Sequence, residues 1–162
     1  MSAFVPLPAA AENPAPAPLP ASGFWPAVDF DALRAAVRID PTVTTDRLRD
    51  SGLAARLQIA AELDAWRQVQ EAAGFATLDQ VPNPRGPQLA AVGVTWSEAL
   101  YFRALASLVA ADMADRTRDA ATSLAGNDRA DAVESTADVH RRNYRHALSD
   151  LQGRGRSTIE LI

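Results

Sequence analysis

The sequence predicts an all-α protein: a small helical bundle of one short and three long helices, with an extended N-terminal arm and an extended C-terminal tail. Three observations lead to this fold class. Apolar residues recur at helical spacing over residues 44–73, residues 96–118 are apolar in nearly all directions, and no two segments look like paired strands. A chain of 162 residues, 48% of them apolar, supports one domain of ordinary size, which we assign to residues 23–153.

Residues 1–22 form the predicted arm, because this stretch is rich in Pro and Ala and cannot build a packed element. A dispensable tail is the favoured interpretation for residues 1–20, and an arm that lies over a neighbouring subunit is the alternative. Phe24 and Trp25 follow beside a turn at Gly23, and their large rings should anchor the end of the arm. Two roles remain open for these rings: they bind a partner, or they cover their own bundle.

A short helix should follow this turn. Asp29 can cap its start, and apolar side chains then recur on one helix face at Phe30, Leu33 and Val37. An Asp-Pro dipeptide at residues 40–41 should break the chain before the next helix, because the residue before a proline avoids helical angles.

The longest predicted helix covers Thr44–Ala73, and the rest of the chain is organised around it. One stripe of this helix should face the core, and it consists of apolar or small residues and one glutamine: Leu48, Gly52, Ala55, Ile59, Leu63, Trp66, Gln70 and Ala73. Leu53 and Leu57 lie on the opposite side with Ala60, which gives the helix a second apolar face. The helix is therefore central to its own domain, or it also contacts another subunit. A Gly-Phe pair at residues 74–75 should end it.

A long loop should cover residues 75–94, which contain three Pro and two Gly residues and little sign of regular structure. Thr95 and Glu98 then have the spacing of a capping box, so a helix should start here and continue to about Arg118. Its apolar residues point in nearly all directions, which is typical of a helix at the centre of a bundle. The last helix should cover residues 128–152.

The composition excludes several classes of function. The formal net charge is −4, so no general positive field attracts nucleic acid, and the absence of Cys excludes disulfides and thiolate metal sites. We expect no secretion signal and no membrane span. His140 and His146 do not share a helix face, and neither has a carboxylate at the spacing of a metal pair. Without a phosphate loop or a nucleophile elbow, the sequence predicts no enzyme, no cofactor and no metal.

Five arginines form the only basic cluster in the sequence: Arg141, Arg142, Arg145, Arg154 and Arg156. They suit the C-terminal end of a helix, where positive charge is favourable, or they contact DNA phosphates or an acidic partner. No aromatic residues lie between them to stack on bases. A partner or helix-end role is therefore weakly preferred, and a helical DNA-binding protein remains the alternative function.

Residues 154–162 form the predicted C-terminal tail. Ile159 and Leu161 alternate with Thr158, Glu160 and Ile162 in a short extended pattern. An apolar end of this kind is costly to leave in water, so we expect it to dock, and we favour a partner over its own bundle as the surface.

An ordered set of segments resembles the head completion/stabilisation protein of temperate contractile-tailed phages, the L protein family. No single motif is diagnostic, but the order of the set is specific, and it covers about residues 22–162. The matching segments are Gly23-Phe24-Trp25-Pro26 with Asp29, Arg38 to Thr44, Arg47-Leu48-Arg49, Trp66, Gly74 to Leu78, Tyr101 with Arg103-Ala104, Asp131-Ala132 with Glu134, Thr136 to Asp138, Arg141-Arg142, and Ser157 to Ile162.

The resemblance implies a structural virion protein that assembles in the host cytoplasm and acts as an adaptor in the neck. Such a protein binds beneath the portal ring after DNA packaging, stabilises filled heads and prepares tail attachment. The implied partners are the portal ring, neighbouring copies in a ring of about twelve, and the tail terminator or next neck protein, with packaged DNA passing through the ring. Partner contacts are expected at the C-terminal anchors and at Phe24, Trp25, Leu53 and Leu57.

Overall fold

The computed structural model describes residues 17–37, 43–82, 93–122 and 127–154, with side chains described up to residue 116 in one long helix and from residue 136 in the next. These residues form five α-helices and one short 3-10 turn: α1 (Phe30–Val37), α2 (Thr45–Glu62), α3 (Asp64–Ala72), η1 (Leu78–Gln80), α4 (Trp96–Thr122) and α5 (Asn127–Leu151). The predicted all-α fold is confirmed, and no strand forms within the described ranges.

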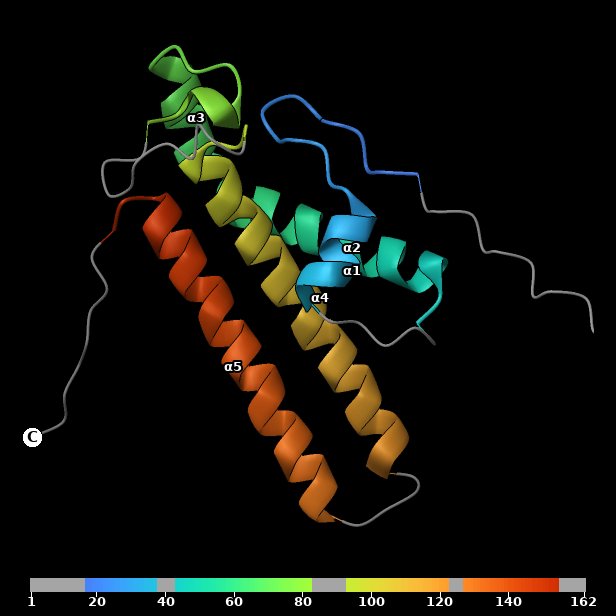
Figure 1. Cartoon of the computed structure of the whole chain (residues 1–162). Coiled ribbons are helices and arrows are strands. Elements are labelled where there is room, and N and C mark those ends of the chain that lie inside the picture. The colour runs from blue at the N-terminus through green and yellow to red at the C-terminus, as the bar shows by residue number, and fades with distance from the viewer. Residues whose placement is uncertain (1–16, 38–42, 83–92, 123–126, 155–162) are drawn as a thin grey trace, which may run out of the picture.

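α4 and α5 form a long antiparallel hairpin, and α1 and α2 lie beside the first half of α4 (Figure 1). α1, α2, η1 and α5 all pack against α4, which confirms the central position predicted from its apolar pattern. The buried residues of α4 point to several sides of the helix, and they include Leu100, Tyr101, Ala104, Leu105 and Val109. The core therefore surrounds α4.

The predicted single helix over residues 44–73 is wrong in one respect, because the chain forms two helices, α2 and α3, that meet at Leu63. Leu63 has φ −97° and ψ 5°, and its side chain is fully buried. Its N–H and carbonyl still make helical hydrogen bonds of 2.9 and 2.8 Å, so the chain bends without losing them. Asp64 starts α3, and its carboxylate accepts hydrogen bonds from the side chains of Arg67 and Gln68, both at 2.7 Å. The acidic first turn favours a second helix start.

The predicted helix ends are confirmed by their hydrogen bonds. Gly74 has φ +98°, and the N–H of Phe75 bonds to the carbonyl five residues earlier at 3.1 Å, as in a glycine C-cap. At the start of α4 the Thr95 N–H donates to the Glu98 carboxylate at 2.9 Å, and the Glu98 N–H donates to the Thr95 hydroxyl at 3.2 Å. The Asp29 carboxylate accepts a backbone N–H of α1 at 2.8 Å.

Residues 17–22 fall in the predicted arm, but they belong to the fold. Leu19 is buried, and its N–H and carbonyl pair with those of Val28 at 3.0 and 2.9 Å. The Pro20 carbonyl accepts a hydrogen bond of 2.7 Å from Nη1 of Arg56, an arginine that is only 8% exposed. Arg56 thus fastens the N-terminal segment to α2. The Pro and Ala composition continues through residues 17–22, so it gave no sign that these residues belong to the fold.

Phe24 and Trp25 are buried in the core of their own chain, at 4% and 7% exposed. The Phe24 ring packs edge-on against Trp66 of α3, with centroids 6.0 Å apart, and Trp25 stacks on Tyr101 of α4 at 5.3 Å. The Phe24 carbonyl also accepts the N–H of Leu78 in η1 at 3.0 Å. Of the two roles left open by the sequence, the structure shows the second: these rings cover their own bundle and offer a partner almost no surface.

The break expected at residues 40–41 lies outside the described residues. The long loop over residues 75–94 is described on both sides of residues 83–92, and its first part is more structured than predicted. It contains η1, and Leu78 and Val81 are buried in the core.

Gly52 lies where α2 packs against α1. A Cβ added at Gly52 would lie 2.8 Å from Cε1 of Phe30, whose ring is only 1% exposed and has little room to move. We predict that Gly52→Ala lowers the free energy of unfolding by about 1–3 kcal/mol, although alanine is the better helix former. Urea unfolding measures the change, and Phe30→Leu in the same chain should recover part of it. A single variant more stable than the parent would contradict this packing.

The two tyrosines should titrate abnormally, because both are buried. Burial raises the pKa of Tyr101 to about 12, although nearby Arg56 opposes the shift, and burial followed by the charge of Glu62 raises the pKa of Tyr144. Unfolded tyrosines titrate near 10, so stability that is present below about pH 10 is lost as the pH rises toward 12. We predict that the native protein reaches half of its phenolate absorbance well above pH 10, whereas the protein in denaturant reaches half of it near pH 10. A native titration centred near pH 10 would contradict the burial.

Candidate partner-binding surfaces

The outer face of α2 carries two exposed leucines. Leu53 is 43% exposed and Leu57, one turn later, is 63% exposed, whereas Leu48 and Ile59 on the other side of the helix are fully buried. The second apolar face read from the sequence is therefore present and open to solvent. Its coverage by another protein stays a prediction.

Two carboxylates continue the same side of α2 toward its start. Asp46 and Asp50 precede Leu53 and Leu57 at helical spacing, and both carboxylate side chains are exposed. We call these four residues the α2 outer face. Asp46 also suits the first turn of the helix, but Asp50 lies beyond that turn, so its charge has no such local role.

The predicted arginine cluster is divided by the structure. Arg142 and Arg145 are exposed one turn apart on α5, and Val139, one turn before Arg142, is 39% exposed. We call Val139 and Arg142 the α5 outer face. Arg145, six residues after Val139, lies about 120° from it around the helix and does not share that face. Arg154 is exposed just beyond the end of α5, and Arg156 lies outside the described residues.

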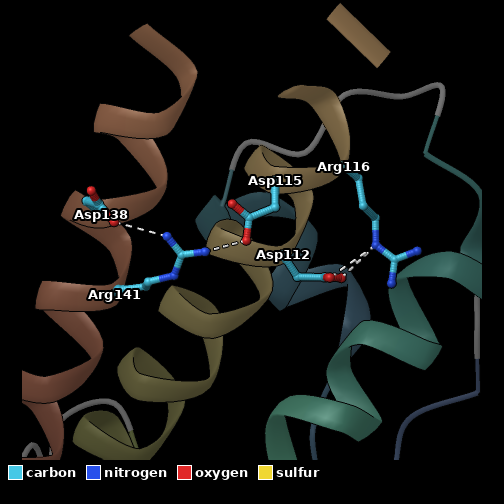
Figure 2. A network of polar contacts seen from close by, with 5 residues as sticks. All are labelled: Asp112, Asp115, Arg116, Asp138 and Arg141. Atoms are coloured by element: carbon cyan, nitrogen blue, oxygen red, sulfur yellow. Dashed lines mark hydrogen bonds and ion pairs between the residues drawn. The ribbon is translucent and has the colours of Figure 1, made fainter. Parts of the chain in front are cut away.

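Arg141 is directed toward α4 and is not part of a free basic surface. Figure 2 shows its guanidinium between Asp138 of α5 and Asp115 of α4, and Nη1 donates to Asp138 at 3.0 Å while Nη2 donates to Asp115. The hydrogen bond to Asp138 and the charge of Asp115 raise the pKa of Arg141. A second pair, Asp112 with Arg116 at 3.0 Å, lies on α4 itself. Of the contacts named here, the one between Arg141 and Asp115 joins the two long helices.

A polar groove lies beside this network, between α2, α4 and α5. Glu62, Asp115, Tyr144 and Arg145 are among the residues that line it. Tyr144 is 4% exposed, and its hydroxyl lies beside the Glu62 carboxylate without a well-formed hydrogen bond in the described part of the chain. No group of three metal-ligating side chains converges anywhere in the described ranges. The groove is a contact region lined by polar side chains from three helices.

An apolar groove lies on another side of the bundle, between α1 and the start of α4. Its lining includes apolar side chains from Val28, Ala32, Ala99 and Phe102, together with Asp29 and Glu98. Its lining resembles the interior of the bundle, so it could accept an apolar segment. Nothing among the described residues occupies it.

The C-terminal anchors expected from the sequence, Ile159, Leu161 and Ile162, lie outside the described residues, and their docking stays a prediction. The chain reaches the tail through a capped helix end: Gly153 has φ +69°, and the N–H of Arg154 bonds to a carbonyl of α5 at 2.9 Å. Within the described ranges, no helix combines the length and the hydropathy needed to span a membrane.

Comparison with known proteins connects this fold to a phage family. A family model described as phage head completion protein (GPL) matches residues 19–162, so the match begins at buried Leu19 and includes every helix of the bundle. The chain belongs to this family. It is 30% identical over 139 residues to the head completion/stabilization protein of Escherichia phage P2, across 86% of this chain and 79% of the relative. No solved structure gives a significant match.

Membership of the head completion family makes the chain a structural phage protein that associates with the virion. The surfaces described above are then candidates for contacts with other virion proteins. The sequence pattern singled out Leu53 and Leu57 but not Asp50 or Val139. Asp50 lies at helical spacing from the leucines, and Val139 lies at helical spacing from Arg142. This spacing could assign them to a surface only once the exposed side of each helix was known.

The network around Arg141 should contribute modestly to stability. Its partners Asp115 and Asp138 have side chains that are 40% and 67% exposed, and exposed ion pairs contribute about 0.2–1 kcal/mol each. We predict that Arg141→Ala lowers the free energy of unfolding by about 1 kcal/mol in urea, and that Arg142→Ala changes it by less than about 0.5 kcal/mol. A larger loss for Arg142 than for Arg141 would mean that α5 is rotated relative to α4.

Proposed function

We propose that this member of the head completion family binds beneath the portal ring after DNA packaging, stabilises the filled head and prepares it for tail attachment. The match of the family model to residues 19–162 carries the proposal, because it spans the whole described bundle. The proposed partners are the portal ring, neighbouring copies of the chain and the tail terminator or next neck protein. Packaged DNA would pass through the ring, and assembly would take place in the host cytoplasm.

The surface of the bundle supports a role in protein contacts. The α2 outer face leaves two large apolar side chains in water, which is typical of a surface that another protein covers. The DNA-binding alternative has less support, because two carboxylates hold Arg141 and the formal net charge of the chain is −4.

The C-terminal tail is proposed to dock on the portal through Ile159, Leu161 and Ile162. Alternating apolar residues can add a short strand to a partner or fill pockets on it.

Light scattering on a sizing column tests the proposal. The intact chain is mixed with the portal ring of the same phage, and the expected complex contains about one copy of the chain per portal subunit. A chain without residues 157–162 should keep its circular dichroism and its unfolding transition but lose binding, since only the tail contacts are removed.

If the intact chain binds neither the isolated portal nor DNA-filled heads, the proposed function is refuted. A truncated chain that still binds the portal would refute only the role of Ile159, Leu161 and Ile162.

A further inference from the structure

The outer faces of α2 and α5 are complementary in charge and in apolar surface. Along α2 the acidic pair Asp46 and Asp50 comes first and the two exposed leucines follow, whereas on α5 the exposed Val139 comes first and Arg142 follows. We propose that the α2 outer face of one copy binds the α5 outer face of a second copy.

The order of the residues fixes the orientation of this contact. If the two helices pair antiparallel, the leucines of α2 face Val139, and the carboxylates of α2 face Arg142. The spacings also agree. Leu53 follows Asp50 by three residues and Arg142 follows Val139 by three, which is roughly 4.5 Å of helix in each case.

The charged groups of both faces are available for a partner. The ion pairs of the described residues engage the arginines at positions 67, 116 and 141, and none of them uses Asp46, Asp50 or Arg142. Opposite free charges at the edge of an apolar contact steer two surfaces together and select their register. The contact would also cover Leu57, which is 63% exposed in the single chain.

Contact between the α2 outer face of one copy and the α5 outer face of another is more favourable than contact between two α2 outer faces. Two α2 outer faces in antiparallel contact would place the Asp50 carboxylate over leucines without a basic partner, and the loss of hydration would be uncompensated. Contact between α2 of one copy and α5 of the next leaves the pair with one free face of each kind, so further copies can add until a ring closes. The inference deepens the proposed function and rests on it for the ring, but the contact itself can be tested without a portal.

The absence of Cys from the chain allows a clean cross-linking test. Leu57→Cys and Val139→Cys are made in separate chains, one of them with a size tag, and equal amounts are mixed and oxidised. The mixed dimer should be the main product, several-fold above either dimer of like chains. Val69→Cys on α3, which is 64% exposed and lies on neither face, replaces Val139→Cys as the matched control and should give no preference for the mixed dimer.

Charge reversal then tests the register. Asp50→Arg in the Leu57→Cys chain, or Arg142→Asp in the Val139→Cys chain, should each reduce the mixed dimer about tenfold, and the two reversals together should restore it. Asp79→Arg and Arg103→Asp, at exposed positions on η1 and α4, are the matched controls and should have little effect. Unfolding curves of all variants exclude loss of the fold as the cause.

Each outcome decides between the proposals. Equal amounts of mixed and like dimers, or reversals that do not compensate each other, would overturn the pairing of α2 with α5. Normal portal binding together with such a result would leave the proposed function intact. A compensated cross-link in a chain that does not bind the portal would support the pairing and refute the proposed function.

Discussion

α4 needs cover on nearly every side, and most of the structure follows from this constraint. Leu105 and Val109 are fully buried on α4, and Tyr101 is covered by the Trp25 ring. α5 covers only one side of α4, so α1, α2 and the N-terminal segment must close the others. This explains why the family match begins at Leu19 rather than at the first helix: residues before α1 already contribute buried surface to the core.

Local patterns in the sequence were sufficient to predict most helices, but they did not predict contacts between residues far apart in the chain. The cap at Thr95 and the glycine end at Gly74 were predictable, because each is made by residues within one or two turns. The bend at Leu63 was not, since the apolar spacing continues through it. The contact of Arg56 with Pro20 joins residues 36 positions apart, and an arginine in a polar helix gives no sign that it will be buried.

The candidate surfaces divide in the same way. Leu53 and Leu57 could be assigned to the outer side of α2, because the opposite stripe is apolar enough to be the core. Arg141 and Arg142 could not be separated, since adjacent residues of a helix differ by about 100° and the phase of α5 is set only by its packing on α4. The structure gives these neighbours opposite roles: Arg141 pairs with Asp115, and Arg142 is exposed.

The internal ion pair and the external surface are therefore linked through one helix. Arg141 pairs with Asp115 of α4, and this contact agrees with the rotation of α5 that its buried side chains, such as Tyr144 and Leu148, already set. The same rotation directs Val139 and Arg142 away from the bundle. An exposed ion pair adds little to the stability of a bundle whose core is already apolar. The consequence of the pair is that Arg141 is occupied inside the chain, and Arg142 is the neighbouring arginine left for a partner.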